Sequence, residues 1–238
     1  MGDSGKNLPA EGASRAEVEA FLRQVAAVPA PRPAGGRGRL IFAMDATASR
    51  QPTWNRACEL QREMFEVTAA LGGLDIQLVY FRGYGECKAG RWLADAGDLA
   101  RAMAGVECLA GHTQWCRVLG HAANETRRVK VAALVCVGDA FEEAIDRLGD
   151  LAGELGLLGV PAFCFHEGAD PQARLAFQQV AKLTRGAYCS FDAGSAGQLR
   201  DLLSAVAVYA AGGLAALTDF NRSRGGAVRL LTDQMNKP

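Results

Sequence analysis

The segment 45–49, DATAS, carries one carboxylate and two hydroxyls at alternate positions. It directly follows the run 40–44, LIFAM, whose unbroken apolar composition is typical of a buried strand. Three oxygen-bearing side chains at the end of a strand suit a hard divalent cation, because such cations take oxygen ligands. The segment therefore indicates a metal site, and the alternative is a polar Asx turn at the start of a helix.

Two other polar residues are expected at the same end of the sheet. Asp139 directly follows the apolar run 135–138, and Thr113 precedes the helical pattern that leads to that run. In a doubly wound sheet, ligands bind beyond the carboxyl ends of the strands, where the strand order reverses. If the strands before Asp45 and Asp139 are neighbours there, the two carboxylates converge. The candidate metal site then comprises two carboxylates and three hydroxyls, from Asp45, Thr47, Ser49, Thr113 and Asp139.

The elements that must position these residues alternate along the chain. The expected strands are Leu40–Asp45, Asp75–Arg82, Val129–Gly138, Pro161–His166 and Ala187–Phe191, with a short extra strand near Glu86–Ala89. Helical patterns cover residues 53–71, 96–105, 114–126, 142–157, 171–184 and 196–211. Alternating strands and helices predict an α/β fold with a doubly wound, mostly parallel, Rossmann-like sheet and right-handed crossovers.

The chain divides into three parts. Residues 1–38 are expected to hold a disordered start, a short helix over 14–28 and a Pro/Gly-rich linker, residues 39–217 the α/β domain, and residues 218–238 a C-terminal tail. The apolar face of the short helix carries Val18, Phe21, Leu22 and Val25. We expect this helix to be an appendage of the main domain.

The constellation DATAS, GHT (residues 111–113) and VGDAF (residues 137–141) resembles the von Willebrand factor A (VWA) domain family. The pattern of that family is DxSxS after the first strand, a loop threonine, and an aspartate after the fourth strand. The resemblance spans roughly residues 39–211. The chain departs from the family pattern at Thr47, where serine is usual, and at Ala140, where glycine is usual. Threonine keeps the hydroxyl but adds a methyl group to the turn.

The resemblance implies a fold, a site and a function. The fold is a six-stranded sheet with one short antiparallel edge strand. The site is a metal-ion-dependent adhesion site (MIDAS) at which the five residues hold Mg²⁺, or another divalent cation such as Mn²⁺ or Ca²⁺. A protein partner supplies an Asp or Glu to the metal. We therefore expect a bacterial, cytoplasmic adaptor in a protein assembly or stress system. The alternatives are a metal-dependent hydrolase in the same crevice and a metal-free interaction module.

Composition narrows the partners and the location. Lys plus Arg and Asp plus Glu both number 26, so the chain has no net charge that would favour nucleic acid or an anionic membrane. No apolar run is long enough to span a bilayer, and the polar N-terminus lacks a signal core. The seven cysteines are odd in number and form no CxxC pair, which favours reduced thiols. We expect a cytoplasmic protein.

Competing sites are weaker. Cys108, His112, Cys116 and His121 are zinc-capable residues, but their spacing is unusual. A phosphatase of the haloacid dehalogenase type needs a second carboxylate where Thr47 stands. No GxGxxG or GxxxxGK[ST] motif is present for a nucleotide. His112 and His166 are the candidate bases for a hydrolase.

Two tryptophans and two glutamates lie near the candidate site in the sequence. Trp54 and Trp115 are expected either to rim the site or to pack helix starts against the sheet. Glu142 and Glu143 are expected to place negative charge at the N-terminus of a helix.

Overall fold

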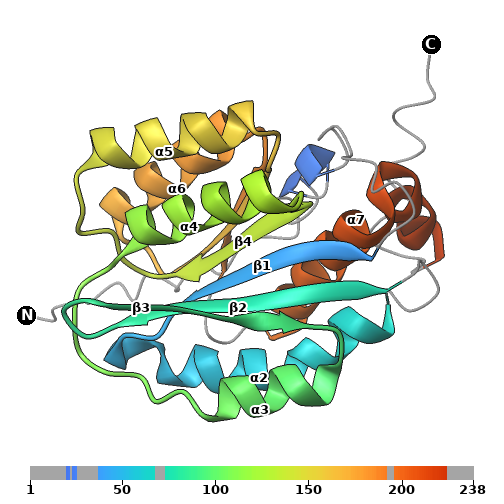
Figure 1. Ribbon diagram of the computed structural model, residues 1–238, viewed down its shortest axis with the longest axis horizontal. Coiled ribbons are helices and arrows are strands. Elements are labelled where there is room, and N and C mark those ends of the chain that lie inside the picture. The colour runs from blue at the N-terminus through green and yellow to red at the C-terminus, as the bar shows by residue number, and fades with distance from the viewer. Residues whose placement is uncertain (1–19, 22, 26–36, 68–72, 192–195, 224–238) are drawn as a thin grey trace, which may run out of the picture.

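The centre of the molecule is one six-stranded sheet. The computed structural model describes residues 20, 21, 23–25, 37–67, 73–191 and 196–223. Its strands are β1 Gly38–Asp45, β2 Leu74–Arg82, β3 Glu86–Leu93, β4 Ala133–Gly138, β5 Ala162–Glu167 and β6 Ala187–Phe191. Their order across the sheet is β3-β2-β1-β4-β5-β6 (Figure 1). β3 pairs antiparallel with β2 and every other pairing is parallel, which confirms the predicted sheet. The antiparallel edge strand β3 ends at Leu93, beyond the expected end at Ala89.

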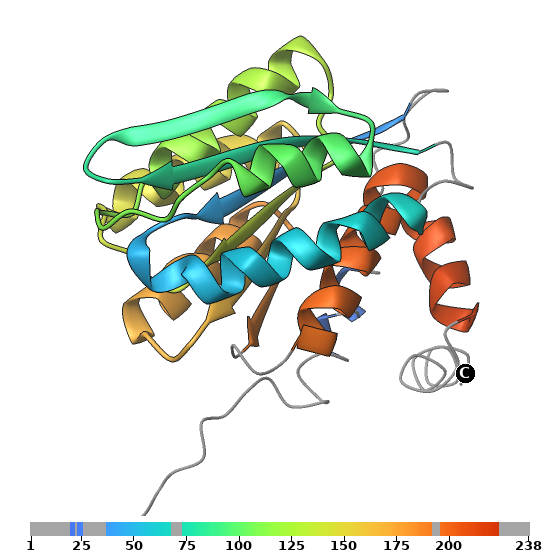
Figure 2. The same ribbon diagram turned by 90° about the horizontal axis from the view of Figure 1, so that it is seen from below.

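Helices cover both faces of the sheet. They are α2 Gln51–Glu66, α3 Ala96–Ala104, α4 Trp115–Arg128, α5 Ile145–Leu157, α6 Pro171–Leu183 and α7 Ala196–Ser223, with a 3₁₀ turn η1 at Ala48–Arg50. Figures 1 and 2 show α4, α5 and α6 on one face and α2, α3 and α7 on the other. Because both faces are covered, the central strands β1 and β4 are mostly apolar, and all six residues of β4 are buried.

Several predicted boundaries were wrong by a few residues. The strand expected from Val129 begins at Ala133, because α4 continues to Arg128 and the Val129 amide still donates to the Glu125 carbonyl at 3.0 Å. Val129 is 56% exposed, which does not suit a central strand. The helix expected over residues 53–71 is observed from 51 to 66. The helix expected from residue 142 begins at Ile145.

A second helical segment follows the predicted last helix. The helix expected over residues 196–211 is interrupted by a kink at Gly213, where φ is 70°, and a further segment of α7 continues to Ser223 (Figure 2). Glycine adopts this conformation without the steric cost of a Cβ. Leu217, beyond the kink, is fully buried, so the second half of the helix also contributes to the core. The expected boundary between domain and tail at residue 217 therefore falls inside a helix.

Helical residues near the N-terminus also belong to the core. Phe21 and Val25 are buried, as the amphipathic pattern predicted. The ring of Phe21 lies 5.3 Å from that of Phe165 and 6.3 Å from that of Phe163, both on β5. The segment is therefore packed against the sheet and is not an appendage. Val18, Leu22, the expected disordered start and most of the linker lie outside the described residues.

None of the helices that the structure describes combines the length and the apolar character needed to cross a membrane.

Candidate functional site

The candidate site lies where the strand order reverses. β1 and β4 are neighbours at the centre of the sheet, with Met44 opposite Val137. The chain proceeds from β1 to β2 in one direction, and from β4 to β5 and β6 in the other. Asp45 ends β1 and Asp139 follows β4, so both leave the carboxyl edge at this point. The structure thus brings the two carboxylates to one edge, as the sequence predicted.

Asp45 is a buried carboxylate. Its Oδ1 accepts a hydrogen bond from the Thr47 amide at 2.7 Å, and its Oδ2 is buried without a hydrogen-bond partner. Burial raises the pKa of the Asp45 carboxyl to about 6, and the nearby Asp139 carboxylate adds to this rise. The Thr47 amide and hydroxyl and the Arg50 guanidinium act in the opposite direction. The Asp45 carboxylate is therefore held in a site that disfavours its charge unless a cation is present.

Hydroxyls connect the segment after β1 to Asp139. Ser49 Oγ donates to Asp139 Oδ2 at 2.8 Å, and Thr47 Oγ1 lies 3.5 Å from Ser49 Oγ. The Thr47 hydroxyl therefore faces the site, as metal binding requires. Asp139 Oδ1 is a second buried carboxylate oxygen without a partner. Two unpaired anionic oxygens beside two hydroxyls form a donor set that fits a hard divalent cation.

Gly138 allows the two halves of the site to approach each other. A Cβ at this position would lie 2.5 Å from the Trp115 ring and 3.4 Å from the Asp45 Cβ. The first of these distances is a steric clash, so only glycine fits between these side chains without rearrangement. Trp115 is itself fixed, because its Nε1 donates to the Ala140 carbonyl at 3.2 Å.

Thr113 approaches the site through a different partner. Its Oγ1 accepts from the Glu142 amide at 2.9 Å, while its own amide donates to Glu142 Oε2 at 3.0 Å. Thr113 is thus joined to the segment that follows Asp139. In the described structure its hydroxyl makes no direct hydrogen bond to Asp45 or Asp139. The hydroxyl is buried on the correct edge of the sheet, one step removed from the two carboxylates.

The loop that carries Thr113 is held by backbone hydrogen bonds. The Leu109 amide donates to the Ala46 carbonyl at 3.0 Å, and the His112 amide donates to the Gly83 carbonyl at 3.1 Å. Gly111 packs so closely on Gly83 that a Cβ would lie 2.0 Å from the Gly83 carbonyl oxygen. These contacts fix the loop between the segment after β1 and the β2–β3 turn.

Sequence reasoning missed an ionic cluster beside the site. Arg50, the residue after Ser49, is only 2% exposed. Its Nη1 forms a close ion pair with Glu167 Oε2 and lies 3.8 Å from Asp139 Oδ2. Thr53 Oγ1 also donates to Glu167 Oε2. The signal for Glu167 was its place at the carboxyl end of β5, one strand beyond β4. Nothing in the sequence indicates that Arg50 is buried.

The tryptophans and the second glutamate have structural roles. Trp54 and Trp115 are buried, so both pack in the core and do not rim the site. Trp54 Nε1 donates to the Met103 carbonyl at 3.1 Å. Glu143 accepts from the Trp115 and Cys116 amides, so it places negative charge at a helix N-terminus as expected, although at that of α4 and not of its own helix.

The competing zinc site does not form. Across the described residues, no three His, Cys, Asp or Glu side chains make a group that could hold a metal ion. His121 lies instead 2.8 Å from Gln77 Oε1, and Cys116 is buried at the start of α4. The Asp45–Asp139 site has only two side chains of these types, because its other oxygens are hydroxyls.

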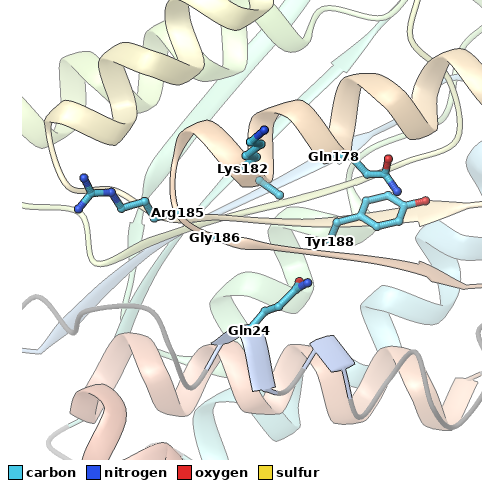
Figure 3. Close-up of a pocket in the computed structure, with 7 residues that line it drawn as sticks. Gln24, Gln178, Lys182, Arg185, Gly186 and Tyr188 are labelled. Atoms are coloured by element: carbon cyan, nitrogen blue, oxygen red, sulfur yellow. The ribbon is translucent and has the colours of Figure 1, made fainter.

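A cavity of about 550 Å³ lies elsewhere, at the edge strand β6. It is lined by Gln24, Gln178, Ala181, Lys182, Arg185, Gly186 and Tyr188. Figure 3 shows the Lys182 and Arg185 side chains pointing in different directions, so their charges do not converge on one point. None of the described residues that line the cavity is an Asp or Glu, so the cavity does not offer the carboxylate donors of the Asp45–Asp139 site.

Comparison with known proteins identifies the fold. No protein-family model matches the sequence, and no curated protein does. Solved structures do match. The VWA domain of SpRpn10 is 14% identical with a TM-score of 0.55, over 70% of this chain and 94% of that one. An aerotolerance-related membrane protein from Bacteroides fragilis is also 14% identical, with a TM-score of 0.53, over 68% and 95% of the two chains.

A third similar structure carries a metal. Proximal thread matrix protein 1 from the mussel byssus, with a zinc-occupied MIDAS motif, is 14% identical with a TM-score of 0.54. The match covers 72% of this chain and 46% of that one. Identities this low show the fold alone. Together with the strand order, they show that this protein has the VWA fold.

Proposed function

We propose that the protein is a protein-binding module that depends on a divalent cation, with Mg²⁺ as the expected ion and Mn²⁺ or Ca²⁺ as alternatives. Asp45, Thr47, Ser49, Thr113 and Asp139 are the proposed metal-site residues. One observation carries the proposal: Asp45 Oδ2 and Asp139 Oδ1 are buried and have no hydrogen-bond partner. Leaving a buried anionic oxygen unpaired is costly, and a cation between the two would compensate both.

The charge of the site suits an acidic partner. Mg²⁺ with Asp45 and Asp139 is close to neutral, and the charge of Glu167 is matched by Arg50. A carboxylate from another protein would therefore be attracted by the cation without repulsion from surplus negative charge. Asp139 is 26% exposed and Ser49 is exposed, so the site is open on one side. The zinc-occupied MIDAS of the mussel protein supports a divalent cation at this place in the fold.

A hydrolase in the same crevice has less support. His166 is fully buried and its Nδ1 lies 3.0 Å from the Tyr188 hydroxyl. His112 Nδ1 lies 3.4 Å from Glu142 Oε2, at the outside of the site. Both histidines are candidate bases in the sequence. In the described structure neither forms a hydrogen bond or ion pair with the carboxyl group of Asp45 or Asp139, and His166 meets Asp139 through the Asp139 backbone. Binding without catalysis is therefore the function that the geometry favours.

The fold and the motif suggest a cellular role. A cytoplasmic adaptor in a protein assembly or stress system would use the cation to capture an Asp or Glu of its partner. This role rests on the resemblance of fold and motif.

Calorimetric titration with Mg²⁺ and with Mn²⁺ tests the proposal. Wild-type protein is expected to bind one ion, and Asp45→Asn is expected to lose binding while keeping the fold, since asparagine retains the acceptor for the Thr47 amide. Capture of partners with and without EDTA, followed by mass spectrometry, tests the second half. A set of captured proteins unchanged by EDTA would contradict metal-dependent recognition.

A further inference from the structure

A buried arginine lies within reach of one proposed metal ligand. Arg50 is 2% exposed, and its Nη1 lies between two carboxylates, in close contact with Glu167 Oε2 and 3.8 Å from Asp139 Oδ2. Its Nε and Nη2 are buried without partners. A guanidinium that has left water needs an anionic partner, because an unpaired buried charge is strongly destabilising. Its charge is therefore shared by the only two carboxylates with which it forms ion pairs in the described structure.

These two pairings have opposite consequences for a metal. While Arg50 is in close contact with Glu167, the Asp139 carboxylate accepts a hydrogen bond from Ser49, lies 3.8 Å from Arg50 Nη1 through Oδ2, and keeps Oδ1 without a partner. If Arg50 moved to Asp139, it would place a fixed positive charge on a carboxylate that the cation needs. Arginine and a divalent cation would then compete for the same anion.

Glu167 is positioned to prevent this competition. Its Oε2 accepts from Thr53 Oγ1 as well as from Arg50, so the carboxylate is anchored to α2. From this geometry we propose that Glu167 holds Arg50 off Asp139 and thereby sets the affinity of the site for its divalent cation. Arg50 and Glu167 are positioning residues and do not ligate the ion. The proposal rests on the proposed function, because it presumes a cation at Asp139.

Two variants separate this role from a simple change of charge. Glu167→Asp keeps the charge but shortens the side chain, so it loosens the contact with Arg50. Glu167→Gln removes the charge and with it the ion pair, and leaves Arg50 only a neutral amide oxygen. We expect each to weaken Mg²⁺ binding by about tenfold, which lies within the range of coupling between residues in contact. A contribution from charge alone predicts no change for Glu167→Asp.

A second substitution provides the rescue. In Glu167→Gln/Arg50→Gln the competing guanidinium is absent, and we expect Mg²⁺ affinity to return to within about threefold of wild type, as non-additive coupling requires. Damage to the fold alone predicts a double variant at least as weak as the single one. Thermal unfolding in EDTA checks that each variant is folded, and Glu167→Asp carries the test alone if the double variant is not.

The outcomes are distinct. Wild-type protein that binds no Mg²⁺ or Mn²⁺ would overturn the proposed function and this inference with it. Wild-type binding with unchanged affinity in Glu167→Asp, or a double variant no better than Glu167→Gln, would overturn only the role of Arg50 and Glu167. Weakened binding in Glu167→Asp with recovery in the double variant supports both.

Discussion

Ser49 and Asp139 are joined by a hydrogen bond of 2.8 Å between two loops that are 90 residues apart in the sequence. Ser49 belongs to the turn after β1 and Asp139 follows β4, so this bond closes the edge of the sheet at the point where the strand order reverses. It also orients Asp139 so that Oδ1, the unpaired oxygen, remains available.

Replacing Ser49 tests that connection. In Ser49→Ala the Asp139 carboxylate loses its hydroxyl donor and the candidate site loses one oxygen. We expect Mg²⁺ affinity to fall by about tenfold, the lower end of the effect of residues that orient metal ligands. The matched control is Ser190→Ala, a half-buried serine on β6, which should leave affinity unchanged. Calorimetry that finds the two variants equal would remove Ser49 from the site.

Thr47 offers a second pair of substitutions. Its hydroxyl lies 3.5 Å from Ser49 Oγ on the side of the site, while its amide holds Asp45. Thr47→Val keeps the shape and the amide but removes the hydroxyl, and we expect Mg²⁺ affinity to fall about tenfold. Thr47→Ser keeps the hydroxyl and restores the residue usual in the VWA pattern, so its affinity should equal or exceed that of wild type. Equal affinities for Thr47→Val and Thr47→Ser would show that the hydroxyl plays no part.

The sequence predicted those parts of the site that depend on strand ends. Asp45 and Asp139 each follow an apolar run directly, so their meeting follows from the parallel sheet and the position of the strand reversal. Thr113 reached the same edge but bonds to Glu142, because loop geometry places the hydroxyl beside that amide. No local pattern foretells such a contact between distant loops.

Arg50 and Glu167 were not predicted for a different physical reason. Arg50 follows an exposed serine in a polar segment, and arginine is seldom fully buried without a partner. Only the fold brings Glu167 and Thr53 to it. The error at Val129 is similar, since apolar residues at a helix end do not reveal whether the helix continues or a strand begins.

Asp45 should make stability depend on pH when no metal is present. Its folded-state pKa is raised from 3.8 to about 6, so between these values the folded protein binds more protons than the unfolded chain. The contribution of Asp45 to stability is therefore greatest below pH 4 and is lost as pH rises through about 6. Each pKa unit corresponds to about 1.4 kcal/mol, so the loss is roughly 3 kcal/mol.

Asp45→Asn isolates this effect, because asparagine cannot ionise. In EDTA, the free energy of unfolding of the variant minus that of wild type should be larger at pH 7.5 than at pH 4.5. Urea titrations at the two pH values measure the difference. Saturating Mg²⁺ should raise the stability of wild type at pH 7.5 and leave the variant unchanged, because binding to the folded state alone is stabilising. If the difference in free energy of unfolding were the same at both pH values, burial would not raise the pKa of the Asp45 carboxyl.

Gly138 tests how closely the site is packed. Gly138→Ala places a Cβ 2.5 Å from the Trp115 ring, which is itself packed between Phe81 and Phe177 at centroid distances of 4.8 and 5.1 Å. The ring cannot retreat without disturbing these edge-to-face contacts, so we expect a loss of about 1–3 kcal/mol in the free energy of unfolding. Gly153→Ala is the matched control, because its Cβ would meet nothing within 4 Å inside helix α5. That variant should gain about 0.5–1 kcal/mol, the usual advantage of alanine over glycine in a helix.

The same substitution should affect the metal site. Because the new Cβ at residue 138 would lie 3.4 Å from the Asp45 Cβ, Gly138→Ala should also weaken Mg²⁺ binding, whereas Gly153→Ala should not. Urea unfolding and calorimetry of both variants check the two expectations, and a Gly138→Ala protein as stable as wild type would show that Trp115 and Asp45 do not depend on glycine between them.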